Sequence, residues 1–540
     1  MQETVTLYRA SKIITMDENL PQATHVAVAG DRIIAVGGEE LETSFGTADT
    51  RFDNNVLVPG FVEGHAHVIE GMTWKYPYVG YYDRMHPDGE IHQGCTTVDS
   101  LVARLGEIES GLEGEDETLF AWGYDAIYFD DKPLRHDLDK VSSSRPIVVI
   151  HSNGHLITVN SLALELAGIN RDNVVDGVYL DESGEPNGEL AEFAAMFPVF
   201  HVVGNPYFGD MDDPEDLRRF ARCCQRAGVT TSTDLYNVLN PAVADLFESV
   251  TREPGFPARI VPAIGSNELS IDETIERARA LRQRNHEKLY MGSVKIISDG
   301  SIQGYSARVR QPYVNGVENG VWFDAPPKLQ QMIDAFHAAD IKMHVHVNGD
   351  EAAELVLQTL EKAIAEHGRR QTHVLQHAQM MDREQLGRAA AIGIMVNFFA
   401  NHTFYWGDQH RDSTVGPERA SRMNAARTAL DLGLDVALHC DAPVTPMKPP
   451  FTMWCAVNRK TASGKDHGPE ECISAEQALR AVTLAPAISI DLADRIGSIS
   501  PGKFADFAVL DKDPLSVDPM KLKDIEVLGT VLGGAWQPAS

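Results

Sequence analysis

The chain of 540 residues is poor in cysteine and in basic side chains and has no long apolar run. Its six cysteines include no CxxC pair, and six are too few for a disulfide framework, so we expect a reducing compartment. Lys and Arg total 47 against 78 Asp and Glu, a net charge of −31, which disfavours nucleic acid or a membrane surface as a partner. No apolar run reaches the roughly 20 residues that span a bilayer. The N-terminus lacks the basic and apolar segments of a secretory signal. These absences predict a soluble, cytoplasmic protein.

Both ends of the chain have sequence patterns typical of β-strands. Short β-branched runs occupy residues 4–16, 24–38, 504–514 and 525–537. Neither end is large enough to bury a core alone, so we expect residues 1–57 and 498–540 to form one small β-sandwich domain. Two unrelated β-rich tails are the alternative.

The middle of the chain alternates apolar strand segments with helical ones. The eight expected strands are 56–67, 228–235, 258–264, 292–300, 341–349, 372–379, 393–401 and 434–443. Helix-period segments such as 272–285, 351–368 and 382–393 lie between them. This α/β alternation predicts a TIM-like (β/α)8 barrel over residues 58–497 rather than an open sheet. The segment at about 70–228 is far longer than one strand-to-strand crossover connection, so we expect it to form an inserted subdomain over the active-site face.

His65 and His67 follow the first barrel strand. Alternate residues of a strand share one face, so both imidazoles project together, as a divalent ion such as zinc requires. A single histidine pair also arises by chance and does not establish a metal site.

Later strands supply further metal-binding side chains. Lys295 lies in an apolar run, where a lysine needs a partner or a modification. Spacings of 51, 31 and 64 residues separate Lys295, His346, His377 and Asp441, which fits about one, one and two strand–helix units. The six residues therefore fall at the ends of strands one, one, four, five, six and eight, which argues against chance.

Five segments carry a family resemblance: PGFVEGHAH, VKIISDGSIQGYSARV, HVNGD, QHAQ and CDAPVTP. They resemble the motifs of the metal-dependent amidohydrolase superfamily. GHLITVNSLALELAGI and ISPGKFADFAVLDKDPL are similar to its amidohydrolase-3 branch, which contains YtcJ-like proteins and N-substituted formamide deformylases.

The resemblance implies a binuclear centre of two divalent ions, with zinc as the expected metal. His65 and His67 would bind the more buried ion, and His346 and His377 the more exposed one. Lys295 would be carboxylated by carbon dioxide and would bridge both ions. Asp441 would bind the first ion and act as the catalytic proton shuttle.

The function so implied is hydrolysis of an amide or related C–N bond by a hydroxide that bridges the two ions. A lactone or ester hydrolase and a mononuclear deaminase are rival enzymes on the same barrel, although Lys295 weighs against the deaminase. A non-catalytic scaffold is a third reading. We expect a small-molecule substrate as the partner and allow for a homodimer.

Other candidates are less specific. His344 shares the face of His346, but the family pattern places the ligand four residues before Asp350, which selects His346. His439 shares the face of Asp441 and departs from the small residue usual in the family. It is either a substrate contact or a hydrogen-bonded barrel histidine.

The inserted segment supplies three substrate-side candidates, Trp122, Tyr124 and His155. Aromatic clusters in such segments are usually local core. At a barrel mouth they would instead favour an apolar or aromatic substrate. A structural loop role is the alternative for His155.

Overall fold

The computed structural model describes residues 5–112, 114, 117–129, 132–205 and 211–539. Short pieces of the expected N-terminal β part and of the expected insertion therefore lie outside the described residues. The chain divides into two compact units. The first unit comprises Met1–His67, Ala221–Ala442 and Met447–Ser540, and the second comprises Val68–Phe220 and Pro443–Pro446. Among the described helices, none combines the length and the apolar character needed to cross a membrane.

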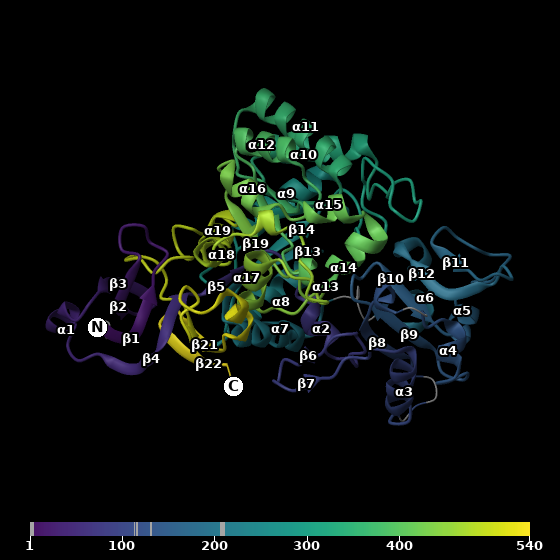
Figure 1. Ribbon diagram of the computed structural model, residues 1–540, viewed down its shortest axis with the longest axis horizontal. Helices are drawn as coiled ribbons and strands as arrows, with labels where there is room; N and C mark the ends of the chain where they lie inside the picture. The colour runs from purple at the N-terminus through teal and green to yellow at the C-terminus, as the bar shows by residue number, and fades with distance from the viewer. Residues whose placement is uncertain (1–4, 113, 115–116, 130–131, 206–210, 540) are drawn as a thin grey trace. The chain divides into compact units, whose positions relative to one another are not determined.

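Eight parallel strands form the barrel of the first unit, which confirms the predicted fold class (Figure 1). They are β5 (Phe61–Glu63), β13 (Val229–Asn237), β14 (Arg259–Gly265), β15 (Ser293–Ile297), β16 (Met343–Val347), β17 (Val374–His377), β18 (Met395–Phe398) and β19 (Val436–Leu438). Each strand pairs with the next along the chain. A bridge between Ala66 and Ala442 joins the first strand to the last.

Helices connect successive strands of the barrel, and others follow its last strand. The connecting helices include α7 (Pro214–Ala227), α8 (Pro241–Thr251), α9 (Ile271–Arg282), α10 (Pro326–Ala338), α11 (Asp350–His367), α12 (Arg383–Ile392) and α16 (Ala426–Asp431). After β19 come α17 (Pro449–Asn458), α18 (Ala475–Ala481) and α19 (Leu484–Ser489). Side chains mark their ends. Asp382 forms a capping box with Gln385 at the start of α12, and Gly393, with a φ of 69°, ends that helix. The three helical segments expected from the sequence correspond to α9, α11 and α12.

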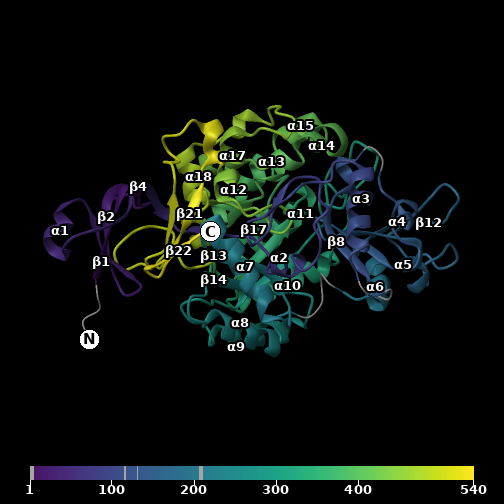
Figure 2. The same cartoon turned by 90° about the horizontal axis from the view of Figure 1, so that it is seen from below.

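Strands from both termini form one seven-stranded sheet. They are β1 (Val5–Ile14), β2 (Gln22–Ala29), β3 (Arg32–Gly37), β4 (Asp49–Pro59), β20 (Phe507–Leu510), β21 (Val527–Leu532) and β22 (Ala535–Pro538). The order β22-β21-β20-β4-β1-β2-β3 places β4 between the C-terminal β20 and the N-terminal β1. Figures 1 and 2 show the purple and yellow strands side by side. A β-rich part built from both termini is thus confirmed.

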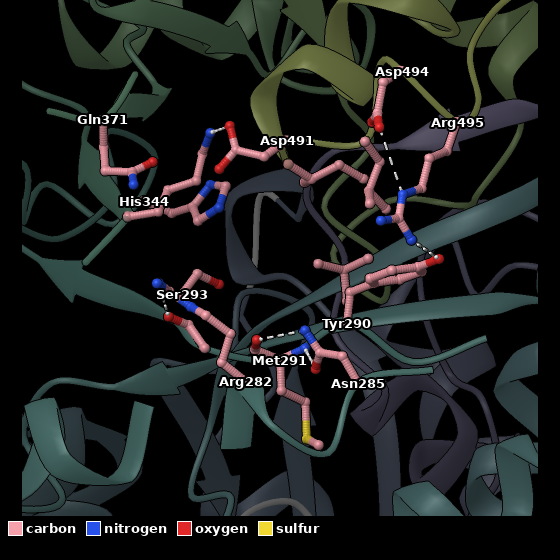
Figure 3. Close-up of a pocket in the computed structure, with 15 residues that line it drawn as sticks. Arg282, Asn285, Tyr290, Met291, Ser293, His344, Gln371, Asp491, Asp494 and Arg495 are labelled. Atoms are coloured by element: carbon pink, nitrogen blue, oxygen red, sulfur yellow. Dashed lines mark hydrogen bonds and ion pairs between the residues drawn. The ribbon is translucent and has the colours of Figure 1, made fainter. Parts of the chain in front are cut away.

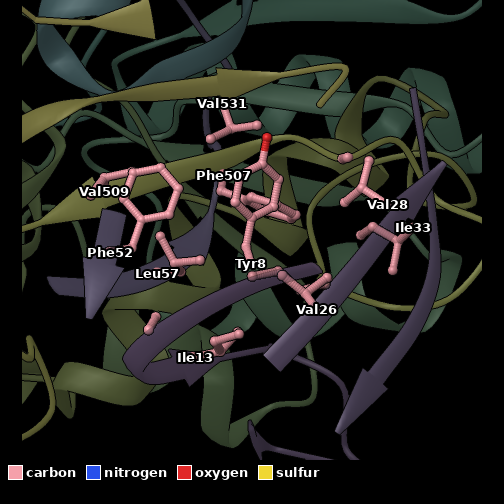
Figure 4. Close-up of a cluster of buried hydrophobic side chains, with 13 residues drawn as sticks. Tyr8, Ile13, Val26, Val28, Ile33, Phe52, Leu57, Phe507, Val509 and Val531 are labelled. Atoms are coloured by element: carbon pink, nitrogen blue, oxygen red, sulfur yellow. The ribbon is translucent and has the colours of Figure 1, made fainter. Parts of the chain in front are cut away.

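The core of this sheet mixes side chains from both ends of the chain (Figure 4). Tyr8 and Phe52 pack with Phe507 and Val531, all of them buried. Neither terminus can bury these side chains alone, which explains why the sheet needs both.

A buried ion pair ties this sheet to the barrel. Arg259 of β14 donates to both carboxylate oxygens of Asp506, at 2.8 and 3.0 Å. Both side chains are 3% exposed, so each charge depends on the other for compensation.

The second unit contains a five-stranded sheet of order β11-β12-β10-β9-β8. Its strands are β8 (Leu119–Tyr124), β9 (Ile147–His151), β10 (Leu156–Val159), β11 (Val178–Leu180) and β12 (Pro186–Ala191). The helices of this unit include α2 (Ile69–Thr73), α3 (Val98–Glu109), α4 (Arg135–Asp139), α5 (Ser161–Leu166) and α6 (Glu192–Val203), and β6 (Arg84–Met85) pairs with β7 (Ile91–His92). Leu101 and Leu105 of α3 pack with Leu119 and Ala121 of β8 in its core.

Candidate metal centre

His65, His67 and Asp441 meet where the barrel closes. The Nε2 atoms of His65 and His67 lie 3.4 and 3.2 Å from Oδ1 of Asp441. The Asp441 N–H donates to the His65 carbonyl at 3.1 Å, so the last strand positions the carboxylate beside the first. Asp441 has a φ of 56°, a left-handed conformation that is uncommon outside glycine and that often marks a functional position.

The protonation states suit metal binding. Burial raises the pKa of Asp441, but the hydrogen bond and charge of His67, with the charges of His439 and Lys295, lower this pKa by more. The carboxyl is therefore ionised near neutral pH. Burial first, and then the charge of Lys295, holds the pKa of His65 well below its usual range. His65 is thus a neutral imidazole, the form that binds metal ions.

Lys295 reaches the same place from β15. Its Nζ lies 3.2 Å from Nε2 of His65. Burial lowers the pKa of Lys295 to about 7, although Asp441 opposes the shift. A large fraction of this amine is therefore unprotonated at neutral pH, which is the form that adds to carbon dioxide.

His377 is the last residue of β17, and His346 lies one residue before the end of the neighbouring β16. His377 has a φ of 67°, and its Nδ1 lies 3.7 Å from Oδ2 of Asp441. The rings of His346 and His377 have centroids 4.5 Å apart. The Nε2 of His346 contacts the Gly300 carbonyl at 3.2 Å and Asn348 Nδ2 at 3.0 Å. All six positions expected to bind metal therefore converge at the carboxyl ends of the barrel strands.

His439 also lies in this cluster. Its ring stacks on His65, with centroids 4.7 Å apart and planes at 21°, and lies 5.0 Å from the ring of His377. Neither Nδ1 nor Nε2 has a hydrogen-bond partner among the described residues. The interpretation of His439 as a hydrogen-bonded barrel histidine therefore finds no support in its contacts.

Gln376, which sequence reasoning missed, orients His65. Its Oε1 lies 2.9 Å from Nδ1 of His65 and accepts a hydrogen bond from Asn397 Nδ2 at 2.8 Å. Because an amide oxygen only accepts, Nδ1 of His65 carries the proton and Nε2 keeps a free lone pair. One indication of this role was present in the sequence: Gln376 is a polar residue in an apolar barrel strand, directly before the expected ligand His377.

Two buried carboxyls were missed as well. Glu63 accepts from the backbone N–H groups of His65 and Cys440, at 3.1 and 3.4 Å, and so spans the first and last strands. Burial raises the pKa of Glu63 to about 8. Asp299 accepts from the N–H groups of Asn348 and Gly349, at 3.0 and 2.8 Å, and burial raises its pKa to about 7.

His344, the rival of His346, lies farther from the carboxyl ends of the strands. Its Nδ1 accepts from Gln376 Nε2 at 2.9 Å. His344 also lines a cavity of about 330 Å³ near the amino ends of β14, β15 and β16 (Figure 3). Lys342, Arg495 and Tyr290 contribute polar groups to the same wall, and none of the six expected ligands lines this cavity.

The three remaining candidates belong to the second unit. Trp122 is buried, donates from Nε1 to the Tyr76 carbonyl at 3.0 Å and packs edge-on against Trp74. Tyr124 is buried on the same strand, and Nδ1 of His155 lies 3.2 Å from Glu192 Oε2. The two aromatic side chains thus pack within their own unit, and the role of all three as substrate contacts stays a prediction.

The donor atoms present fit a divalent cation. One donor atom each from His65, His67 and Asp441 lies within 4.8 Å of the other two, and the same holds for His65, His377 and His439. Nδ1 of His377 is buried with no hydrogen-bond partner among the described residues. Buried polar atoms without partners are costly, and a bound ion would satisfy them.

A parallel eight-stranded barrel whose carboxyl strand ends gather imidazoles, a carboxylate and a buried lysine defines a metal-dependent hydrolase. A model of the amidohydrolase family matches residues 53–536, and the chain belongs to that family.

Individual relatives are similar to this chain over nearly its whole length. The putative amidohydrolase YtcJ of Bacillus subtilis is 28% identical over 551 residues, which cover 98% of each chain. The N-substituted formamide deformylase of Arthrobacter pascens is 24% identical over 546 residues, 97% of this chain and 96% of that one. The crystal structure of an uncharacterized metal-dependent hydrolase from Pyrococcus horikoshii has a TM-score of 0.72 at 19% identity, covering 95% of this chain and 99% of that one. The resemblance to the amidohydrolase-3 branch is confirmed.

Proposed function

We propose that the protein hydrolyses an amide or related C–N bond of a small substrate that has an apolar or aromatic part. The observation that carries the proposal is the convergence of an ionised Asp441 with the neutral imidazole of His65, at 3.4 Å, and with a lysine of lowered pKa, Lys295. The proposed ligands of two divalent ions are His65, His67, Lys295, His346, His377 and Asp441. Zinc is the expected ion, because histidine nitrogens and carboxylate oxygens suit it.

When bound, such ions lower the pKa of water and polarise a scissile carbonyl. The chain supplies the proton transfers. Asp441 accepts a proton at a carboxylate oxygen from the attacking water and donates it to the leaving nitrogen. Nε2 of His67 lies 3.2 Å from Oδ1 of that carboxylate.

Once carboxylated, Lys295 would supply an anionic oxygen ligand for the ions. The unprotonated Nζ would add to the carbon of carbon dioxide: the C–N bond forms, one C=O π bond opens with its electron pair going to oxygen, and the nitrogen releases a proton. The resulting carbamate carries one negative charge on two oxygens, which a neutral amine or an ammonium cannot offer. Its location 3.2 Å from His65 supports this role.

Substituted formamides are the first substrates to test, because the relative from Arthrobacter pascens is an N-substituted formamide deformylase. The purified protein should be assayed for metal content and for turnover of aryl and alkyl formamides, N-acyl amines and aryl lactones. We expect two metal equivalents and release of formate or another acid, lost on chelation and restored by Zn²⁺.

The rival functions give different outcomes in the same assay. Turnover of lactones or esters without amides would favour the ester hydrolase. One metal equivalent with release of ammonia would favour a deaminase, and no metal would favour the scaffold.

A further inference from the structure

His439 differs from the other buried histidines of the barrel. It is fully buried, yet both ring nitrogens lack hydrogen-bond partners among the residues that the structure describes. His65 and His344, by contrast, each bond to Gln376 through Nδ1. An imidazole that gives up water on both sides without compensation destabilises the fold, so its retention needs an explanation.

The ring of His439 is held in place by its surroundings. Its backbone N–H donates to the Phe398 carbonyl at 3.0 Å, which continues the pairing of β19 with β18. The ring lies between His65 and Phe399, with centroid distances of 4.7 and 4.8 Å. Stacking accounts for an aromatic ring at this position, but it uses neither nitrogen.

The neighbouring nitrogens supply the missing explanation. The ring centroids of His65 and His377 lie 4.5 Å apart, and that of His439 lies within 5.0 Å of both. One nitrogen from each of the three rings lies within 4.8 Å of the other two. Three imidazoles are a donor set that zinc uses in catalytic sites.

We infer that His439 is a metal ligand, which forms with His65 and His377 an all-nitrogen donor set beside the Asp441 carboxylate. The inference rests on the proposed metal centre and adds a seventh residue to it. An extra imidazole makes the centre richer in nitrogen, so it favours Zn²⁺, Co²⁺ and Ni²⁺ over Mg²⁺ and Mn²⁺, which prefer oxygen.

Cobalt tests the inference without reference to turnover. The protein is produced in cobalt-supplemented medium, its metal is counted, and its visible ligand-field absorption is recorded. His439→Phe keeps a stacking ring but offers no donor atom. We expect this variant to lose absorption intensity and to release cobalt to a competing chelator at least ~10-fold more readily, since even outer contacts of a ligand change affinity by 10–100-fold.

A second variant and a control keep the result interpretable. His439→Ala should regain the absorption band on addition of imidazole, which rules out a loss through misfolding. His402 is also buried and packs on Phe399 at 4.5 Å, but its Nδ1 has a partner in His410 at 2.9 Å, and His402→Asn should leave the spectrum unchanged.

The outcomes distinguish a failure of the proposed metal centre from a failure of the ligand role of His439. A wild type that binds no cobalt would overturn the metal centre itself. A wild type with full cobalt, and a folded His439→Phe with the same spectrum and chelator resistance, would overturn only the ligand role of His439.

Discussion

Oε1 of Gln376 lies 2.9 Å from Nδ1 of His65, and this contact fixes which nitrogen of His65 faces Asp441 and Lys295. Gln376→Leu keeps similar volume but removes the acceptor. We expect its metal affinity to fall by ~10–100-fold, the usual effect of losing a partner behind a ligating histidine. Chelator competition measures the change. Gln358→Leu, on an exposed face of α11, is the control, and equal affinities in the two variants would refute the role.

Lys295 should carry a carbamate in the active protein. Labelling with ¹³C-bicarbonate should give one carbamate signal by carbon NMR, and Lys295→Ala should lose the signal, metal and turnover. Short carboxylic acids should restore part of the metal and turnover, since they offer two oxygens in the vacated space. Lys342 is the matched control: it is also buried, but its Nζ donates to Asp491 at 2.6 Å, so Lys342→Met should keep the signal. Full activity with an unlabelled Lys295 would contradict the proposal.

Asp441→Asn should separate proton transfer from folding. The variant keeps the size and one oxygen but loses the charge and the base, so turnover should fall by the ~10²–10⁴-fold that a positioned base contributes. The melting temperature should change little. Asp435, which precedes the same strand and pairs with Arg480 at 2.9 Å, provides Asp435→Asn as a control. Near-normal turnover of Asp441→Asn would reject Asp441 as the proton shuttle.

Glu63 makes stability depend on pH. Its pKa rises from an ordinary value of 4.5 to about 8 through burial, so the folded chain keeps a proton that the unfolded chain loses. The stabilisation is complete below about pH 4.5 and is lost as the pH rises towards 8, by up to about 1.4 kcal/mol per pH unit.

Urea unfolding of the metal-free protein between pH 5 and 8 measures this slope. Glu63→Gln, which keeps the accepting oxygen, should flatten the slope, whereas Glu366→Gln on the surface should not. An unchanged slope in Glu63→Gln would show that Glu63 ionises normally.

The sequence predicted the barrel and the convergence of the six positions expected to bind metal, because both depend on local patterns. Alternation in the segment around His65 and His67 sets the face of both rings, and each later ligand follows its own apolar strand. The residues that hydrogen-bond to these side chains and orient them could not be predicted in the same way. Gln376 meets His65 across the barrel interior, 311 residues away in the chain, so its contact depends on the register of several strands. The order of the terminal sheet likewise depends on pairing between distant strands.

Removing one partner of the Arg259–Asp506 pair should destabilise the protein strongly. Asp506→Ala leaves the buried guanidinium of Arg259 without its counter-charge, and we expect a loss of about 3–5 kcal/mol. The double variant Arg259→Met/Asp506→Leu should recover much of it. Arg427 and Asp431 form an exposed pair at 2.8 Å, and Asp431→Ala should cost less than about 1 kcal/mol. Denaturant unfolding compares the three, and equal losses would refute the distinction.

The sheet built from both termini can be completed only late in synthesis, because its central strands come from opposite ends of the chain. Strand β4 ends at Pro59 and its partner β20 begins at Phe507, so about 450 residues are synthesised between them. At ~5–20 residues per second, β4 waits roughly 20–90 s with one edge unpaired. Unpaired strand edges are where nascent chains associate with one another. We therefore expect the yield of correctly folded molecules to depend on translation speed and on chaperone supply as well as on equilibrium stability.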